Sequence, residues 1–306
     1  MEPGRPCIMA AMATARIHGV QLHFEIVGEG GPWLALITGG RRSYAEFVPL
    51  AGRIAGHGYR VVLHDRRNTG ASQIVVDAGD DDLGEEEIWT DDVVALMDHL
   101  GASPAVYGGA SSGARTCLLT CLRHPEAVRA LVLMRVTGGA FAARRLPEMY
   151  YSQFIRAARE GGMAAVCATE QIRERIAAHP PNGPYLAGLD PERYIAVMSR
   201  WLAKFESGLH SPVMGVTDAE LASIAVPTLV VPGNDRTHSS SSALAAARQI
   251  PGSTLFRLPI EDEDIPLIPF SDWAAHEPAL AQRIDAFLRA LPRPTPDRTP
   301  APSHGR

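Results

Sequence analysis

The sequence predicts an α/β fold built on a doubly wound, mostly parallel sheet. Continuous apolar runs of strand length lie at residues 33–38, 59–64, 130–136 and 226–231, and such runs are typical of strands that are covered on both faces. Segments with helical periodicity separate them. Strands and helices that alternate through short links favour parallel pairing, with helices on both sides of the sheet.

The first third of the chain supplies the start of this sheet. Residues 14–27 alternate apolar and polar side chains around a glycine-containing turn, which predicts an antiparallel hairpin. Helices are expected over residues 43–58 and 86–100, because apolar side chains recur there with helical spacing. The acidic run at residues 77–87 predicts a solvated loop.

A long helical insertion interrupts the sheet. Residues 138–222 contain no strand-like run but several amphipathic helical stretches. The alternation resumes after them, with a strand at 254–258 and a final helix at 278–291. We therefore assign residues 14–137 and 223–291 to an α/β core and residues 138–222 to an inserted helical cap.

The two ends of the chain have no pattern of a packed element. Residues 1–13 are expected to be a flexible N-terminus that is too short and too polar for a signal peptide. Residues 292–306 are rich in proline and polar side chains, which predicts a disordered tail. No stretch approaches the roughly 20 apolar residues of a transmembrane helix. We expect a cytoplasmic protein with no membrane partner.

Composition narrows the classes of partner. The net charge is −5, with 34 acidic and 29 basic residues interspersed along the chain and no basic block, which argues against nucleic acid. The 4 cysteines include no CxxC pair and are interpreted as reduced, buried thiols rather than metal ligands. We expect no cofactor and no metal, and a small-molecule substrate as the partner. The sequence is compatible with a homodimer.

One short motif carries a chemical prediction. Gly109-Ala110-Ser111-Ser112-Gly113 reads GxSxG and lies between a short apolar run and a segment of good helix formers. This is the form of a nucleophile elbow, a strained strand-to-helix turn that presents one serine hydroxyl. So tight a turn leaves room only for small residues two positions on either side. Ser111 is therefore the candidate nucleophile.

Four features in this order make the chain similar to the α/β-hydrolase superfamily in its cap-bearing form. They are the Gly39-Gly40 turn, the DRRNTGAS stretch at residues 65–72, the elbow, and the GND stretch at residues 233–235. The resemblance covers residues 14–291 and implies a serine hydrolase. Serine at the elbow, where some relatives have aspartate, argues against an epoxide hydrolase or dehalogenase mechanism.

The resemblance implies roles for the residues around Ser111. The backbone amides of Gly40 and Ser112 are expected to form the oxyanion hole. Asp235 follows a predicted strand and is expected to orient a histidine base. Arg41, beside the oxyanion turn, is open to two interpretations, contact with an anionic substrate group or a surface position.

The histidine base has the weakest sequence signal. The resemblance places it in the loop between the last strand and the last helix, where His276 is the histidine available, and we choose it. His238 is the alternative, although it lies only three residues after Asp235 in the sequence.

The expected activity is hydrolysis of an ester, lactone or related acyl bond in a small, largely apolar substrate through an acyl-enzyme. A C–C bond hydrolase of the same fold would use the same residues. A ligand-binding protein with a degenerate triad is the non-catalytic alternative.

Overall fold

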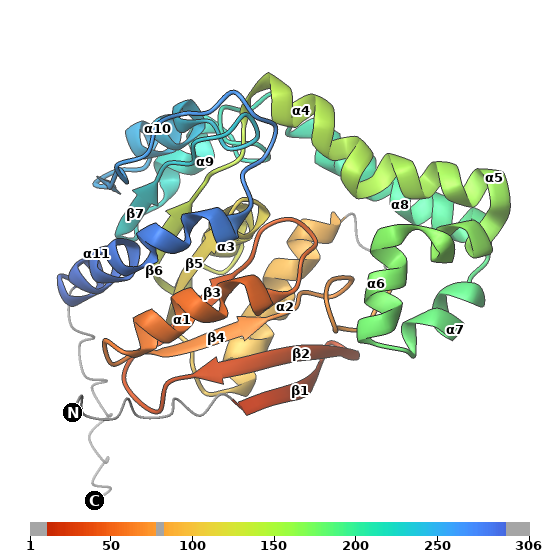
Figure 1. Cartoon of the computed structure of the whole chain (residues 1–306), viewed down its shortest axis with the longest axis horizontal. Coiled ribbons are helices and arrows are strands. Elements are labelled where there is room, and N and C mark those ends of the chain that lie inside the picture. The colour runs from red at the N-terminus through yellow and green to blue at the C-terminus, as the bar shows by residue number, and fades with distance from the viewer. Residues whose placement is uncertain (1–10, 78–82, 292–306) are drawn as a thin grey trace, which may run out of the picture.

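The computed structural model describes residues 11–77 and 83–291, and its centre is an 8-stranded sheet with the order β1-β2-β4-β3-β5-β6-β7-β8 (Figure 1). The strands are β1 (Ala11–Ile17), β2 (Val20–Val27), β3 (Trp33–Ile37), β4 (Arg60–His64), β5 (Ala105–Ala110), β6 (Val128–Met134), β7 (Thr228–Val231) and β8 (Thr254–Leu255). Pairing is antiparallel between β1 and β2 and between β2 and β4, and parallel in all the other pairs. The predicted fold class is confirmed.

Helices connect the strands in the expected alternation. They are η1 (Tyr44–Phe47), α1 (Val48–Ala55), α2 (Glu85–His99), α3 (Ser112–Arg123), η2 (Pro125–Ala127), α4 (Gly139–Pro147), η3 (Glu148–Ser152), α5 (Gln153–Ala168), α6 (Glu170–Ala178), α7 (Asn182–Ala187), α8 (Pro191–Ser207), α9 (Asp218–Ser223), α10 (Ser240–Gln249), η4 (Phe270–His276) and α11 (Glu277–Arg289).

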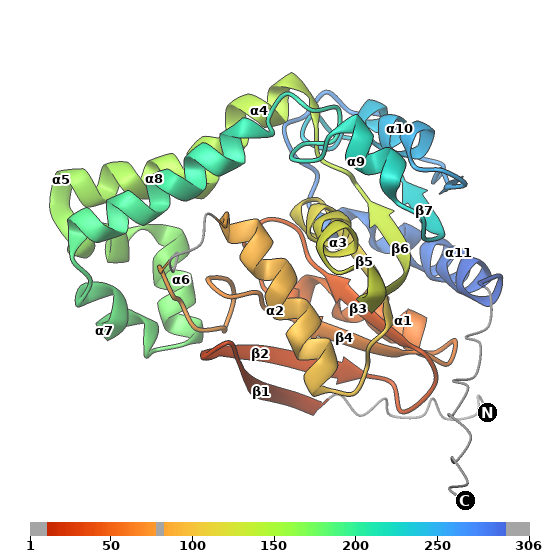
Figure 2. The same cartoon turned by 180° about the vertical axis from the view of Figure 1, so that it is seen from behind.

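Each face of the sheet is buried under its own helices. Apolar side chains of α1 and α11 pack on one face, and those of α2, α3 and α10 pack on the other (Figures 1 and 2). Because both faces are covered, side chains at successive positions of β3 are all buried, as at Leu34, Ala35 and Leu36. This explains why the parallel strands appear in the sequence as unbroken apolar runs.

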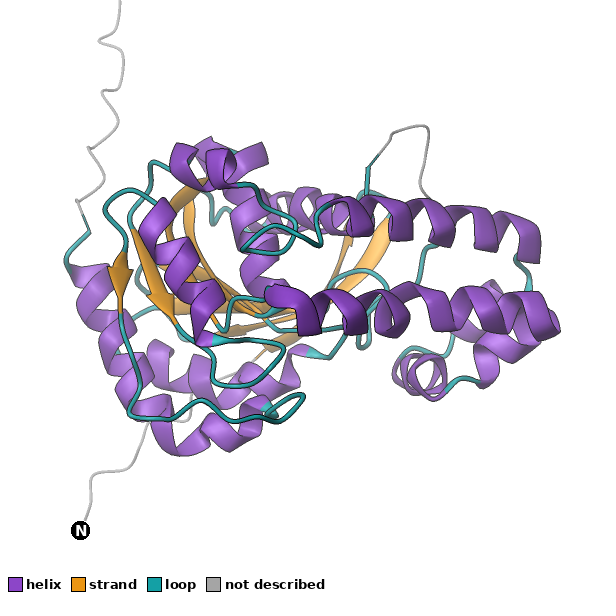
Figure 3. Ribbon diagram, turned by 90° about the horizontal axis from the view of Figure 1, so that it is seen from above, coloured by secondary structure: helices purple, strands orange, loops and turns teal. Residues whose placement is uncertain are grey.

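The helices between β6 and β7 form a third hydrophobic cluster. Its buried members include Tyr151, Phe154 and Trp201, which are all at most 1% exposed. Helices α5 and α8 run side by side and project away from the strands (Figures 1 and 3). The segment predicted as a cap, residues 138–222, holds α4 to α8 and most of α9.

Several sequence boundaries change. Residues 11–13, assigned to a flexible terminus, pair with β2 in β1 because the hairpin extends further than its alternating pattern indicated. Strand β8 covers two residues of the predicted 254–258. The prediction for residues 1–10 and that of a disordered tail at 292–306 lie outside the described residues. Within the described part of the chain, no helix is both long and apolar enough to cross a membrane.

Candidate active site

Ser111 lies on a strained turn between β5 and α3. Its φ of 58° and ψ of −123° are outside the regions that L-residues favour. A Cβ added at Gly113 would lie 2.1 Å from the carbonyl oxygen of Ile37, and one at Gly109 would lie 2.5 Å from the backbone carbon of Gly113. Both glycines are therefore required sterically, and the sequence folds into the elbow that its GxSxG pattern predicted.

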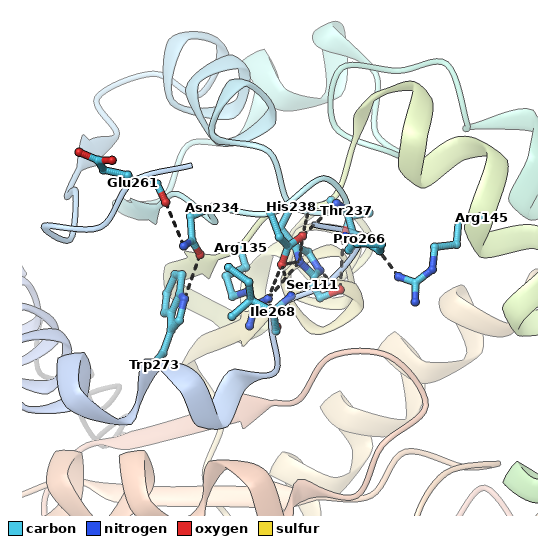
Figure 4. Close-up of polar contacts among 12 residues, drawn as sticks. Ser111, Arg135, Arg145, Asn234, Thr237, His238, Glu261, Pro266, Ile268 and Trp273 are labelled. Carbon is cyan, nitrogen blue, oxygen red and sulfur yellow. Dashed lines mark hydrogen bonds and ion pairs between the residues drawn. The ribbon is translucent and has the colours of Figure 1, made fainter. Parts of the chain in front are cut away.

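A histidine and a carboxylate form a hydrogen-bonded series with this hydroxyl. His238 Nε2 lies 2.7 Å from Ser111 Oγ, and His238 Nδ1 lies 3.0 Å from both carboxylate oxygens of Asp235. The side chains of His238 and Asp235 are 3% and 0% exposed. Figure 4 shows Ser111 and His238 meeting below the loop that follows β7. This is the geometry of a nucleophile, a base and an acid that orients the base.

The turn after β7 brings the acid and the base together although only three residues separate them. Asp235 Oδ1 accepts hydrogen bonds from the backbone N–H groups of Thr237 at 2.9 Å and of His238 at 2.8 Å. A side chain that caps its own turn in this way folds the chain back upon itself. Gly233 permits the reversal, since a Cβ there would lie 2.4 Å from the carbonyl oxygen of His238.

Arg135, the residue after β6, is a further charged group of the site. It has a φ of 49°, its side chain is 4% exposed, and its Nη2 donates to Asp235 Oδ2 at 2.6 Å. The same nitrogen donates to the carbonyl of Ile268 and lies 3.3 Å from His238 Nδ1. No sequence pattern distinguishes Arg135, because an arginine at the end of a strand has many structural uses.

The electrostatics favour a charged acid and a neutral base. Burial alone would raise the pKa of Asp235, but hydrogen bonding and ion pairing with His238, the N–H of Ile268 and Arg135 hold that pKa well below its usual range. Burial lowers the pKa of His238; the hydrogen bond to Asp235 opposes this shift and the charge of Arg135 adds to it. A neutral imidazole that donates from Nδ1 can accept a proton at Nε2.

The turn after β3 approaches the nucleophile from the other side. A Cβ added at Gly39 would lie 2.9 Å from Ser111 Cβ, so only glycine fits there. The carbonyl of Gly40 accepts hydrogen bonds from Arg66 Nη2 at 2.5 Å and from Ser112 Oγ at 3.1 Å, which fixes the turn. Ser112 is the first residue of α3, where backbone N–H groups have no partner within the helix.

A cavity of about 650 Å³ opens onto Ser111. One side is formed by the turn after β3 and the loops after β6, β7 and β8. The other side comes from the helices between β6 and β7, through Leu146, Met149, Tyr150, Gln171 and Arg175. The volume lies within the range of about 300–1,000 Å³ typical of small-molecule sites. No cluster of metal-ligating side chains occurs in the described ranges.

Comparison with known proteins agrees with this architecture. A family model described as alpha/beta hydrolase fold matches residues 32–160. The crystal structure of an enol-lactonase from Burkholderia xenovorans LB400 superposes with a TM-score of 0.59 over 90% of this chain and 100% of that one. The chain has the α/β-hydrolase fold. At 21% identity, the likeness to the lactonase concerns the fold of this chain and not its substrate.

Curated relatives match a shorter part of the chain. The uncharacterized hydrolase YraK of Bacillus subtilis (strain 168) is 32% identical over 119 residues, which is 39% of this chain and 42% of that protein. A 2-hydroxy-6-oxononadienedioate/2-hydroxy-6-oxononatrienedioate hydrolase of Burkholderia vietnamiensis (strain G4 / LMG 22486) is 31% identical over 119 residues, 38% of this chain and 40% of that protein. The matched region spans about two fifths of each relative.

The choice of His276 as the histidine that meets Ser111 is corrected by the structure. His276 ends η4 and is the N-cap residue of α11, whereas His238, the alternative, occupies the hydrogen-bonding position at Ser111. The loop between β8 and α11 instead braces the acid, because the N–H of Ile268 donates to Asp235 Oδ2 at 3.0 Å. The Asp-x-x-His spacing was a signal for His238, since an aspartate that caps its own turn brings the third residue after it against its carboxylate.

Of the two interpretations of Arg41, the surface position is wrong. Its side chain is 5% exposed and is paired with the buried Glu85 in a two-pronged contact. The rings of Trp89, Tyr150 and Tyr151 lie 5.0–5.6 Å from its guanidinium. The prediction of a solvated loop at residues 77–87 is likewise wrong at Glu85, because α2 begins there and carries this carboxylate inward.

Proposed function

We propose that this α/β-hydrolase cleaves an ester, lactone or related acyl bond through an acyl-enzyme on Ser111. The observation that carries the proposal is the hydrogen-bonded series from Ser111 Oγ through His238 to Asp235. A degenerate site would leave the serine without a base, so this arrangement supports the catalytic alternative over the ligand-binding one.

The proposed reaction uses each group in turn. Ser111 Oγ attacks the carbonyl carbon of the substrate, and its proton passes to His238 Nε2. The negative charge that develops on the carbonyl oxygen is held by the backbone amides of Ser112 and Gly40. The tetrahedral intermediate expels the alcohol, which takes the proton from His238. The product at this stage is an acyl ester of Ser111.

Water completes the cycle. It transfers a proton to His238 Nε2 as its oxygen attacks the acyl carbon, and Ser111 Oγ leaves with that proton. Asp235 keeps its negative charge throughout and stabilises the imidazolium that forms twice per turnover. Within this proposal, the helices between β6 and β7 act as the cap that shapes the substrate cavity.

A covalent probe and two histidine variants test the proposal. A fluorophosphonate should label the wild-type protein and not Ser111→Ala. Hydrolysis of p-nitrophenyl butyrate should fall by about 10³-fold or more in His238→Asn, whereas His276→Asn should retain wild-type activity. The absence of labelling, or full turnover by His238→Asn, would contradict the proposal.

C–C bond hydrolysis is a second candidate, because one curated relative carries the name of a 2-hydroxy-6-oxononadienedioate hydrolase. The same serine and histidine would serve it. Incubation with a 2-hydroxy-6-oxo-dienoate, followed by its ultraviolet absorbance, distinguishes the two. Loss of absorbance that requires Ser111, with no turnover of simple esters, would favour this candidate.

A further inference from the structure

The active-site cavity contains more arginine than acidic side chains. Among the residues that line it, the acidic ones are Glu46 and Glu174, and the arginines are Arg41, Arg42, Arg135, Arg145 and Arg175. Three of the arginines are paired with a carboxylate: Arg41 with Glu85, Arg42 with Glu46 at 3.6 Å and Arg135 with Asp235 at 2.6 Å. Arg145 instead donates to Thr237 Oγ1 at 3.2 Å.

Arg175 is the buried arginine of the cavity that forms no ion pair among the described residues. It lies on α6, is 6% exposed, and donates from Nη2 to Gln171 Oε1 at 3.2 Å. Across residues 11–77 and 83–291 no carboxylate lies within ion-pair distance of it. Burial and the neighbouring charge of Arg41 lower the pKa of Arg175 to about 10, so it is still charged at neutral pH. A buried cation without a counter-ion is costly.

The nearby carboxylate Glu85 has no capacity left for Arg175. Its two oxygens already accept hydrogen bonds from both terminal nitrogens of Arg41, from Asn68 Nδ2 and from the hydroxyl of Tyr151. Four donors fill the acceptor sites of a carboxylate. Glu174, the residue before Arg175, is exposed to solvent. Arg175 therefore has no ion-pair partner among the described residues, and it lines the cavity.

The position of α6 separates this charge from the reacting serine. Helix α6 lies beside one end of β2, whereas the loop after β7 that carries His238 lies on the opposite side of the molecule's upper face (Figures 1 and 2). The cavity that joins them is lined in part by the apolar side chains of Leu146 and Met149. An elongated substrate would reach from one to the other.

We propose that Arg175 forms an anion subsite that binds a carboxylate of the substrate, remote from the bond that Ser111 attacks. A guanidinium matches the planar geometry of a carboxylate and binds it through paired hydrogen bonds. One carboxylate supplies the single negative charge that Arg175 lacks. The inference rests on the proposed hydrolase function and specifies its substrate as an acyl compound with a distal carboxylate.

A pair of matched esters tests the subsite. Mono-p-nitrophenyl suberate carries a distal carboxylate, and p-nitrophenyl octanoate has the same acyl length without it. In Arg175→Gln, kcat/KM for the suberate ester should fall roughly 10- to 100-fold, mainly through KM, the loss of a charged hydrogen bond. The octanoate ester should change by less than about twofold, and Arg175→Lys should recover part of the loss.

The matched control is Arg173→Gln, which removes an exposed arginine of the same helix that does not line the cavity. Both esters should then be hydrolysed within about twofold of the wild-type rate. Equal losses for both esters in Arg175→Gln, or no loss for either, would overturn the subsite.

A binding measurement separates this proposal from the hydrolase proposal. If wild type hydrolyses neither ester, the acyl-transfer function fails for these substrates, and the subsite is judged by suberate binding to Ser111→Ala. Suberate should raise the Tm of Ser111→Ala and not that of Ser111→Ala/Arg175→Gln, while 1,8-octanediol should raise neither. Equal shifts in both variants, or none in Ser111→Ala, would refute the anion subsite.

Discussion

Replacing Arg135 by methionine tests the electrostatic account of the site. Methionine keeps a long apolar stem in place of that of arginine. It removes the guanidinium that donates to Asp235 Oδ2 and to the carbonyl of Ile268. It also removes the positive charge 3.3 Å from His238 Nδ1. Stability and the pH dependence of activity should therefore both change.

The magnitude follows from what Asp235 retains. Breaking a buried ion pair typically costs about 3–5 kcal/mol. Asp235 still accepts from the backbone N–H groups of Thr237, His238 and Ile268, so we expect the lower end, about 3 kcal/mol. At 2–4 °C for each kcal/mol, Tm should fall by roughly 6–12 °C. Because a positive charge is lost, the pKa of His238 should rise and the acidic limb of kcat/KM should move toward neutral pH.

Thermal unfolding and a pH profile with p-nitrophenyl butyrate measure the two effects. Arg236→Gln is the matched control, since it removes an arginine of the same loop whose partner, Asp264, is 93% exposed. That pair is expected to contribute less than about 1 kcal/mol. An acidic limb that stays in place or moves to lower pH in Arg135→Met, or a Tm equal to that of the control, would refute the reasoning.

Three shorter predictions address other features. Because the pKa of His238 is lowered and the neutral form is the base, wild-type kcat/KM should fall only below about pH 6.5, the ordinary histidine value; a limb above it would contradict the account. Gly113→Ala would drive a Cβ into a β3 carbonyl and should lower the urea unfolding free energy by about 3 kcal/mol; Gly52→Ala, where the Cβ meets open space, should not, and equal effects would count against the elbow argument. Burial raises the pKa of the Cys117 thiol and raises that of Cys121 to about 11, so iodoacetamide should modify neither in the native protein, as mass spectrometry would detect.

The fold and the elbow were predictable because they leave local patterns in the sequence. Unbroken apolar runs reflect strands with two covered faces, and the glycines around Ser111 reflect close backbone contacts that no larger residue fits. Asp235 could be placed after β7 because it follows a short apolar run in the sequence. These inferences needed no knowledge of how distant segments meet.

The rest depends on contacts between distant residues. Arg41 and Glu85 lie 44 positions apart, and only the packing of α2 against the turn after β3 makes them partners. His276 was preferred because family resemblance fixed an expected position, whereas the geometry of one turn decides in favour of His238. Arg175 has no sequence signal at all, since α6 has the ordinary amphipathic pattern of a surface helix.

The short spacing of Asp235 and His238 frees another part of the chain to vary. Because both groups lie in the loop after β7, their alignment closes a very small loop and costs little chain entropy. The side chains of residues 261–266 are exposed, and residues 267–270 line the cavity. Side-chain substitutions in this long loop can therefore reshape the substrate cavity while the base keeps its place after β7, provided that the backbone contact from Ile268 to Asp235 is preserved.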